Sequence, residues 1–521
     1  MANVRSLTAF TVISFQFLAC LSACTESSTP VDRILPDGLL HGVAYTDTEV
    51  LKGIPYAEPP TGALRWKPPV KNVSYPTGRD ALASGPICSQ RKLGESTIDP
   101  TSSEDCLYLN VWLPRQPGPS PVMIYFPGGA YVIGGAAEPE FDGRKLSKAG
   151  HVIVVVASYR LGPLGFASHK ALASEDPAHP NSGNYGLLDQ REVMRWVQRN
   201  ISELGGDASR ITIFGESAGA GSVCVHTVSP GSKGLFTSAI MQSPPCTAYP
   251  FPDRAKSEAQ GEQLATALGC SGDDASVLSC MRAHTSDEVI GALPLKTHII
   301  YGPGVDWGPV VDGDVLPDQP LTLLAHGDSA DVPVIVGSNA DEGTLFFAEN
   351  DSINTEADLR SLLGELFPPA TVEATIAHYP ITSSAKGTAN HILGDIFVCD
   401  ARRIARYHAA AGRRAYRYYF ARAFFDIILD LGSFHGAELP FVFGNALKGL
   451  PVLLIGRPLR DAIQGYWTTL AAAGDPNGGK RPMWSPYDPI SDISMRLDLP
   501  VAAAKGVRAA DCDFWDTQRT P

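Results

Sequence analysis

Short apolar runs rich in β-branched and aromatic residues recur along the chain, and each ends in a turn signal. Examples are Val122–Phe126, Val152–Ala157, Ile211–Phe214 and Val332–Gly337. Runs of this kind are typical of strands buried on both faces of a parallel sheet. Asp189–Asn200 instead places its apolar residues at helical spacing. Strands that alternate with helices predict an α/β fold with a mostly parallel central sheet flanked by helices.

Composition favours one large globular unit. Of the 521 residues, 44% are hydrophobic and 19% are charged, an ordinary balance for a globular protein. The 50 glycines and 42 prolines are spread out, and no repeat or low-complexity block separates parts of the chain. We therefore expect a single domain over residues 33–521. The net charge of −13 argues against nucleic-acid binding, because phosphate contacts need a basic face.

The N-terminus has the pattern of an export signal. Arg5 precedes the apolar run Leu7–Ala19, which is too short to span a membrane and has the length of a signal-peptide core. The run leads into Leu21–Cys24 (LSAC), which resembles a bacterial lipobox, where cleavage precedes the cysteine and the cysteine is acylated. We predict a signal peptide at 1–23, then lipidated Cys24 and a polar tether at 24–32. The protein would then be a cell-envelope lipoprotein anchored in a membrane; the alternative is plain secretion.

Export also makes disulfides plausible. Beyond the N-terminal segment the cysteines are Cys88, Cys106, Cys224, Cys246, Cys270, Cys280, Cys399 and Cys512. Cys88 and Cys106 enclose a short loop, and so do the cysteines at 270 and 280. Cys224 and Cys246 are either a further bridge or two buried thiols. Connectivity does not follow from sequence alone.

A candidate nucleophile follows the strand predicted at Ile211–Phe214. The chain continues as Gly215-Glu216-Ser217-Ala218-Gly219, the G-x-S-x-G pattern of a nucleophile elbow. Such a turn lifts the Ser217 hydroxyl clear of the sheet, and side chains at the two glycine positions would collide across it. The pentapeptide alone also fits an ordinary tight turn. Its position between a strand and a small-residue helix start favours catalysis.

Further motifs resemble the type-B carboxylesterase/cholinesterase family over nearly the whole exported chain. In chain order they are Leu51–Pro69, Glu104–Trp112, Asn184–Gln190, Gly215–Ala220, Gly308–Gly313, Asn339–Gly343, His435–Gly444, Gly474–Gly478 and Cys512–Trp515. The resemblance implies the α/β-hydrolase fold and hydrolysis of carboxylic esters through an acyl-enzyme. Neither a cofactor nor a metal is expected, and no H-E-x-x-H, Walker or Rossmann pattern occurs.

The resemblance implies a triad of Ser217, Glu342 and His435, in the Ser–acid–His order of α/β-hydrolases. His435 would take the serine proton and return it to the leaving alcohol, while Glu342 would fix the tautomer of His435. The residues alone do not select His435 from 12 histidines. Asp341 also competes with its neighbour Glu342, and only the family position favours Glu342.

An oxyanion hole is expected from the amides of Gly129, Ala130 and Ala218. Members of the family commonly have a histidine before the Gly-Gly-Gly or Gly-Gly-Ala of this loop, whereas this chain has Pro127. Ala130 keeps its amide, so the donors survive if the backbone adopts the loop geometry. Pro127 lacks both an amide N–H and an imidazole, so the hydrogen bonds that support the loop must come from other residues. The alternative is a simple strand-ending turn.

The resemblance assigns supporting residues as well. Glu216 and Glu438 correspond to family acids near the catalytic histidine, which implies an electrostatic role; a purely structural role is equally open. The disulfides that the family pattern implies are Cys88–Cys106, Cys270–Cys280 and Cys399–Cys512.

The substrate pocket is less well defined. In the cholinesterase branch, a tryptophan in the loop between the first two cysteines binds the quaternary amine by cation–π attraction. Here Ser89–Asp105 contains no aromatic residue, so we expect weak or no selectivity for choline esters. Trp307 aligns with the family's acyl-pocket wall, where an indole would favour short acyl chains. The alternative is that Trp307 is a structural residue of the hydrophobic core.

Two other functions fit the same fold. A catalytically inactive binding protein would typically lack a triad member, whereas Ser217, Glu342 and His435 are all present. A lipase, thioesterase or amidase would keep the chemistry and change the substrate, but the large apolar lid usual in lipases is not identifiable. The expected ligand is a small-molecule ester, and no protein partner is inferred.

Overall fold

The computed structural model describes residues 27–71, 74–92, 95, 97–175, 181–296, 298, 300–423, 430–446 and 454–519. The predicted signal peptide and Cys24 lie outside these residues. Within them, none of the helices combines the length and the apolar character needed to cross a membrane.

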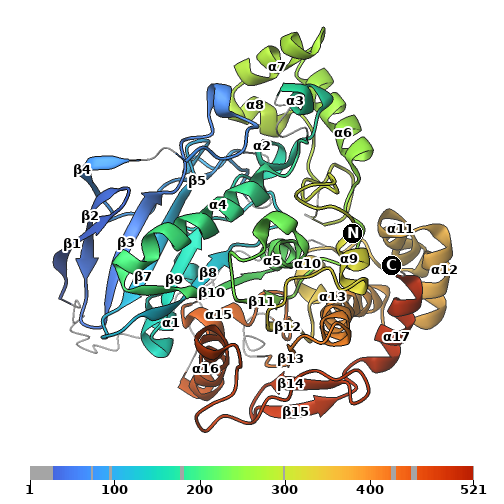
Figure 1. The fold of residues 1–521 in the computed structure, drawn as a ribbon. Helices are drawn as coiled ribbons and strands as arrows, with labels where there is room; N and C mark the ends of the chain where they lie inside the picture. The colour runs from blue at the N-terminus through green and yellow to red at the C-terminus, as the bar shows by residue number, and fades with distance from the viewer. Residues whose placement is uncertain are drawn as a thin grey trace, which may run out of the picture.

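A 13-stranded sheet forms the centre of the molecule (Figure 1). In spatial order its strands are β1 (Thr29–Leu35), β2 (Gly38–Ala44), β3 (Thr48–Pro55), β7 (Tyr108–Pro114), β9 (Ile153–Ala157), β8 (Ser120–Phe126), β10 (Gly206–Glu216), β11 (Ser238–Gln242), β12 (Val334–Asn339), β13 (Ala415–Phe420), β14 (Ile493–Leu497) and β15 (Ala502–Lys505), with β4 (Tyr75–Asp80) paired to β2. Neighbours from β9 to β14 are parallel, and antiparallel pairs complete both ends. This is the predicted fold class.

The central strands are buried on both faces, which is why they read as continuous apolar runs. Alternate residues of β8 enter two separate hydrophobic clusters, with Val122 and Ile124 on one face and Met123 and Tyr125 on the other. The first face is covered by α4 (Tyr185–Asn200), α5 (Ala218–Val228) and α13 (Ala385–Ala410), and the second by α1 (Arg144–Gly150), α15 (Leu439–Phe443) and α16 (Arg457–Ala473).

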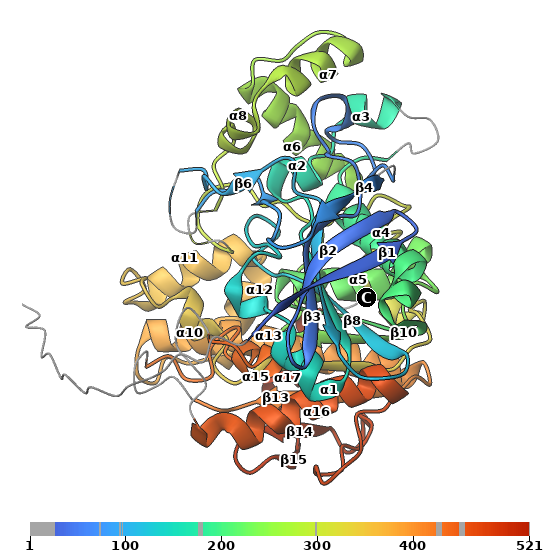
Figure 2. The ribbon, with the colours of Figure 1, turned by 90° about the vertical axis from the view of Figure 1, so that its left-hand side faces the viewer.

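Other helices lie outside this three-layered centre. At the top of Figures 1 and 2, four helices gather: α3 (Lys170–Glu175), α6 (Arg254–Ala267), α7 (Asp274–Ala283) and α8 (Ser286–Gly291). A third apolar cluster joins α13 to α11 (Glu356–Leu366), α12 (Pro369–His378) and α17 (Ala509–Gln518). The remaining helices that matter below are the short α2 (Gly162–Phe166), α9 (Pro320–Ala325) and α10 (Gly343–Phe346).

Four disulfides join the described cysteines: Cys88–Cys106, Cys224–Cys246, Cys270–Cys280 and Cys399–Cys512. The three predicted pairs are therefore confirmed. The open alternative for Cys224 and Cys246 is resolved as a bridge, which ties α5 to the segment that follows β11.

The sheet starts earlier than the boundary predicted at residue 33. Strand β1 begins at Thr29 and pairs with β2 along its whole length, from Thr29 opposite Ala44 to Leu35 opposite Gly38. From Pro30 to Leu35, exposed residues alternate with more covered ones, because successive side chains of a strand point to opposite faces of the sheet. Residues 29–32 therefore belong to the folded domain, not to a tether.

Candidate active site

Ser217, Glu342 and His435 follow the carboxyl ends of three parallel strands. Ser217 lies between β10 and α5, Glu342 lies between β12 and α10, and His435 lies between β13 and α15. These strands are adjacent in the order β10-β11-β12-β13. The three residues therefore lie along one edge of the sheet, where sites of open α/β sheets form.

The backbone at Ser217 is strained, with φ 56° and ψ −125°. Non-glycine residues rarely adopt this region, and such strain is typical of functional turns. A Cβ on Gly215 would lie 2.5 Å from the carbonyl carbon of Gly219, so a side chain cannot be placed there. The Ser217 N–H donates to the carbonyl of Gln242 at 2.9 Å, which ties the turn to β11.

Glu342 is fully buried and both of its carboxylate oxygens are engaged. One oxygen lies 2.5 Å from Nδ1 of His435. The other accepts from the Ser243 hydroxyl at 2.5 Å and from the Asn339 N–H at 2.6 Å. A carboxylate beside Nδ1 favours the tautomer protonated at Nδ1, which leaves Nε2 as the basic nitrogen.

The structure separates the two adjacent carboxylates that compete in the sequence. Asp341 accepts from the Ser433 N–H at 2.9 Å, and no contact between Asp341 and the ring of His435 occurs in the described part of the chain. Of these two carboxylates, Glu342 is the one that approaches the imidazole from the Nδ1 side.

The Nε2 atom of His435 lies beside Glu216, with 3.2 Å between Nε2 and Oε1, and it makes no hydrogen bond within the described residues. The imidazole ring also contacts Phe346 and Phe397, each with ring centroids 4.9 Å away. Ser217 and Glu216 approach the same place, since a Cβ on Gly128 would lie 3.2 Å from Cβ of Ser217 and 3.0 Å from a carboxylate oxygen of Glu216. A basic nitrogen, a carboxylate and the serine side chain thus converge.

Glu438 is a further buried carboxylate, and it connects the ends of two strands to the histidine loop. It accepts from Nε2 of Gln242 at 2.8 Å and from Nδ2 of Asn339 at 2.6 Å. Asn339 donates to the carbonyl of Phe434 at 2.8 Å, and Trp467 donates to Gln242 at 3.1 Å. Sequence reasoning missed Gln242, although Asn339 stands in the Asn339–Gly343 motif.

Three carboxylates around one imidazole perturb the pKa values of the site. Burial lowers the pKa of His435, but the charges of Glu216, Glu342 and Glu438 outweigh burial and raise it to about 9. Burial raises the pKa of Glu216 to about 8, opposed by His435 and helped by the other two carboxylates. Burial and the charge of Glu342 also raise the pKa of Glu438. At neutral pH the cluster therefore retains a proton, carried by Glu216 or by His435.

The predicted oxyanion loop follows β8. Gly129, Ala130 and Tyr131 all have positive φ, at 106°, 52° and 61°. The amides of Gly129, Ala130 and Ala218 have no acceptor in the described chain, so all three are free to bind a negatively charged oxygen.

The loop keeps its support despite Pro127. The hydroxyl of Tyr159 donates to the carbonyl of Pro127 at 2.7 Å, and the side chain of Gln90 pairs with the backbone of Gly134. A peptide carbonyl of any residue accepts the Tyr159 bond, which is why a proline is tolerated at this position. Sequence reasoning missed both supports, because Tyr159 and Gln90 lie in other segments and no local pattern distinguishes them.

Trp307 is buried in the largest hydrophobic cluster. The next residue, Gly308, lies against the oxyanion loop, since a Cβ there would be 3.1 Å from the ring of Tyr131. The segment is thus next to the predicted site, and Trp307 also contributes to the core.

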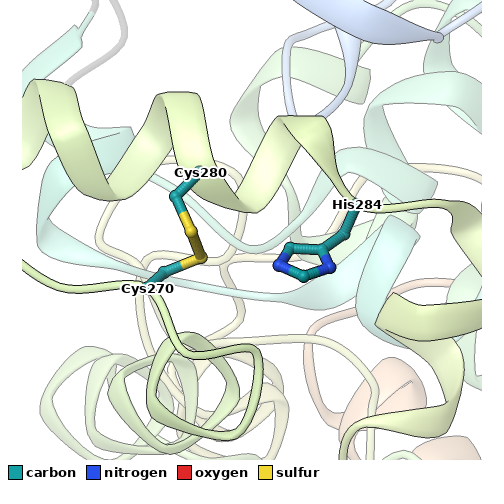
Figure 3. Close-up of side chains that lie close together, drawn as sticks. All are labelled: Cys270, Cys280 and His284. Atoms are coloured by element: carbon teal, nitrogen blue, oxygen red, sulfur yellow. A yellow bond between two sulfur atoms is a disulfide. The ribbon is translucent and has the colours of Figure 1, made fainter.

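Two groups of side chains have the composition of metal ligands. Figure 3 shows Cys270, Cys280 and His284, where the two sulfur atoms are bonded to each other and are not free thiolates. The other group is His391, Asp395 and Asp511. There the guanidinium of Arg508 contacts both His391 and Asp395, so a cation is already supplied by the chain.

A strained serine at a strand-to-helix turn, an imidazole bonded to a buried glutamate and a loop of free amides define a serine hydrolase of the α/β-hydrolase fold. The model of the Carboxylesterase family matches residues 33–515, and the chain belongs to this family.

Named relatives span nearly the same length. The chain is 34% identical over 495 residues to a fumonisin B1 esterase of Sphingopyxis macrogoltabida, covering 91% of this chain and 88% of the relative. It is 32% identical over 505 residues to a mouse (Mus musculus) cholinesterase, covering 89% and 82%. A solved PNB esterase superposes with a TM-score of 0.81 at 29% identity, covering 95% of this chain and all of the other. The protein is a serine carboxylic ester hydrolase.

Proposed function

We propose that Ser217 is the residue acylated by the ester, with His435 as general base and acid and Glu342 as the group that orients it. The observation that carries the proposal is the 2.5 Å hydrogen bond between Glu342 and Nδ1 of His435. Nε2 of the same ring makes no hydrogen bond within the described residues and lies 3.2 Å from Oε1 of Glu216, the neighbour of Ser217. Nε2 would take the hydroxyl proton as the Ser217 oxygen attacks the carbonyl. A hydrogen bond from the Ser217 hydroxyl to Nε2 would form when substrate binds, since catalytic hydrogen bonds often reach their final geometry only in the complex.

The amides of Gly129, Ala130 and Ala218 would hold the oxyanion of the tetrahedral intermediate. Collapse of this intermediate breaks the bond to the alcohol, which takes the proton from His435 and leaves. Water then attacks the acyl-enzyme with the same base, and Ser217 regains its proton. One such amide donor is typically worth about 3–4 kcal/mol of transition-state stabilisation.

Glu216 and Glu438 would stabilise the imidazolium that forms in both halves of the reaction. Glu216 contacts the ring directly, with its Oε1 3.2 Å from Nε2 of His435. Glu438 would act at longer range; it is held by hydrogen bonds from Asn339 and Gln242, which lie at the ends of β12 and β11.

The test of the nucleophile is labelling with a fluorophosphonate probe. We expect stoichiometric labelling of the wild-type protein and none of Ser217→Ala, whose kcat should fall by at least about 10³-fold. Ser222→Ala is the control: it removes a buried hydroxyl from α5, the helix that follows Ser217, and the variant should label normally. Labelling of Ser217→Ala at the wild-type rate would rule out the proposal.

For the substrate we propose a small ester with a short acyl chain and no requirement for a quaternary amine. The relatives' names refer to different esters, so the preference must come from this chain. Trp307, which precedes the Gly308 that lies against the oxyanion loop, would limit the acyl side. The loop from Cys88 to Cys106 offers no aromatic ring for a cation. A p-nitrophenyl series from acetate to palmitate should favour the short acids, and Trp307→Ala should extend the range. An unchanged chain-length profile, or a higher kcat/KM for acetylcholine than for its neutral isostere, would contradict the proposal.

The disulfides indicate a protein that folds in an oxidising compartment outside the cytosol. Beyond this, we propose that Cys24 is lipidated and anchors the enzyme to a membrane of the cell envelope. The proposal is supported by the lipobox-like Leu21–Cys24 and by the signal-peptide pattern before it.

A further inference from the structure

The oxyanion loop folds back so that its two ends touch. A Cβ on Gly134 would lie 2.5 Å from the carbonyl oxygen of Gly128, so these two residues are in direct backbone contact. The carbonyl of Gly128 and the N–H of Gly129 belong to one planar peptide unit. The position of Gly134 therefore bears directly on the direction in which the Gly129 amide points.

Gln90 holds Gly134 at both of its backbone polar groups. Its Oε1 accepts from the Gly134 N–H at 2.8 Å, and its Nε2 donates to the Gly134 carbonyl at 2.9 Å. The second proton of Nε2 goes to the carbonyl of Cys88, also at 2.9 Å. The Gly134 N–H needs an acceptor and the two carbonyls need donors, so the side-chain amide of Gln90 can take only the orientation with Oε1 towards the Gly134 N–H. Gln90 is only 5% exposed, so water does not compete for these bonds.

Gln90 is itself anchored within the loop closed by Cys88–Cys106. It lies two residues after Cys88, its carbonyl accepts from the Asp99 N–H at 2.9 Å, and its N–H donates to the Ser102 hydroxyl at 3.4 Å. The disulfide loop therefore presents the amide of Gln90 to the oxyanion loop from a braced position.

We propose that Gln90 is a positioning residue for ester hydrolysis, which holds the Gly128–Gly129 peptide in the direction that receives the oxyanion. The proposal rests on the proposed oxyanion role of the Gly129 amide. Gln90 touches no reacting atom. Its removal frees Gly134 and lets the Gly128–Gly129 peptide rotate. The transition state then loses more stabilisation than the bound ester does, because the oxyanion forms only in the transition state.

Gln319 provides a matched control. Its side-chain amide pairs in the same way with one backbone residue, accepting from the Phe251 N–H at 3.0 Å and donating to the Phe251 carbonyl at 2.8 Å, outside the oxyanion loop. Gln90→Leu and Gln319→Leu thus each remove a pair of bonds to one backbone residue, and Gln90→Leu also removes the bond to the carbonyl of Cys88. For p-nitrophenyl acetate we expect kcat of Gln90→Leu to fall about 10- to 100-fold with KM within about 3-fold of wild type. The kcat of Gln319→Leu should stay at the wild-type value.

A second measurement uses a trifluoromethyl ketone, which forms a tetrahedral adduct with an active serine. Its affinity for Gln90→Leu should fall by the same factor as kcat/KM, because the adduct uses the same amides. A lower Tm in both leucine variants, with kcat and ketone affinity unchanged in Gln90→Leu, would reduce Gln90 to a structural residue and overturn the proposal. Should Gln90→Leu fail to fold, Gln90→Asn takes its place, since the shorter amide cannot reach both groups of Gly134; full kcat in Gln90→Asn would equally overturn it.

These experiments distinguish a failure of the proposed role of Gln90 from a failure of the proposed nucleophile, Ser217. A wild-type protein that forms no ketone adduct, or a Ser217→Ala protein that keeps its activity, would refute the nucleophile itself. A normal adduct in the wild type with an unaffected Gln90→Leu refutes only the role of Gln90.

Discussion

At the scale of single residues, the bond pattern of Glu342 makes its replacement diagnostic. In Glu342→Gln, the amide oxygen would face the Ser243 hydroxyl and the Asn339 N–H, which are both donors. The amide NH₂ would then face Nδ1 of His435 and select the tautomer protonated at Nε2, which cannot accept the serine proton. We expect kcat to fall by about 10³- to 10⁴-fold at unchanged fold, measured with p-nitrophenyl acetate and checked by circular dichroism.

Asp341→Asn is the control for this variant, because Asp341 contacts the Ser433 N–H instead of the imidazole. Its asparagine oxygen can still accept that bond, so activity should remain close to wild type. Equal losses in the two variants would mean that Glu342 has no special relation to His435.

The carboxylate of Glu216 should control the pH dependence. Burial lowers the pKa of His435, but Glu216 and the other two carboxylates raise it to about 9. Since only neutral His435 can accept the serine proton, kcat/KM should rise as pH increases towards this value. Glu216→Gln removes one negative charge, lowers the pKa of His435 and moves the acid limb of kcat/KM to lower pH.

The same change should lower the pH-independent maximum of kcat by about tenfold, because the imidazolium of the transition state loses a stabilising charge, and one pKa unit corresponds to about 1.4 kcal/mol. The full pH profile of both proteins separates the two effects. An acid limb that stays in place in Glu216→Gln would show that Glu216 does not act on the charge of His435.

At the scale of the elements, prediction succeeded where burial alone dictates the pattern. The runs at Val122–Phe126 and Val152–Ala157 coincide with β8 and β9 because both faces of these strands are covered. The edge strands β1 and β15 gave no such signal, since their exposed residues need not be apolar. The helix predicted at Asp189–Asn200 begins at Tyr185, because Tyr185 and Leu187 are buried although they precede the periodic stretch.

The candidate site was predictable to a different extent. The Ser217 turn follows from local chemistry, as its glycines are required by contacts within a few residues. The choice of Glu342 over Asp341 and of His435 among the histidines depends on contacts between segments far apart in the chain, so it came only from the resemblance. Gln90 is the clearest case, because its partner Gly134 lies 44 residues away and the Gln90 side chain bonds only to backbone groups, which leave no mark in the sequence.

The Cys224–Cys246 bridge belongs to this scale, because it joins α5, which begins directly after Ser217, to the segment after β11. The pair closes a loop with a sequence separation of 22, for which the chain-entropy model gives about 3 kcal/mol. The double variant Cys224→Ala/Cys246→Ala should therefore unfold at a lower temperature than the wild type. Alkylation of the denatured, unreduced wild type, read by mass spectrometry, should leave both cysteines unmodified; alkylation of either would show that the bridge is absent.

At the scale of the whole molecule, the position of the proposed anchor relative to the site predicts that attachment and catalysis are independent. The first strand begins at Thr29, only five residues after Cys24, and it lies at the far edge of the sheet from β10–β13, where the catalytic residues lie. An acyl group on Cys24 would thus hold the domain close to a bilayer at its β1 edge while leaving Ser217 unaffected.

Cys24→Ser tests this arrangement on the full chain, expressed in a bacterium that processes lipoproteins. Several acyl chains anchor a protein stably, whereas an unmodified domain of net charge −13 has no comparable attraction to an anionic bilayer. We expect the wild type to partition into the detergent phase of Triton X-114 and Cys24→Ser into the aqueous phase, with equal kcat/KM. Wild-type protein found in the aqueous phase, with the mass of an unacylated chain, would instead establish plain secretion, and the enzyme would then meet its ester in solution and not at a membrane surface.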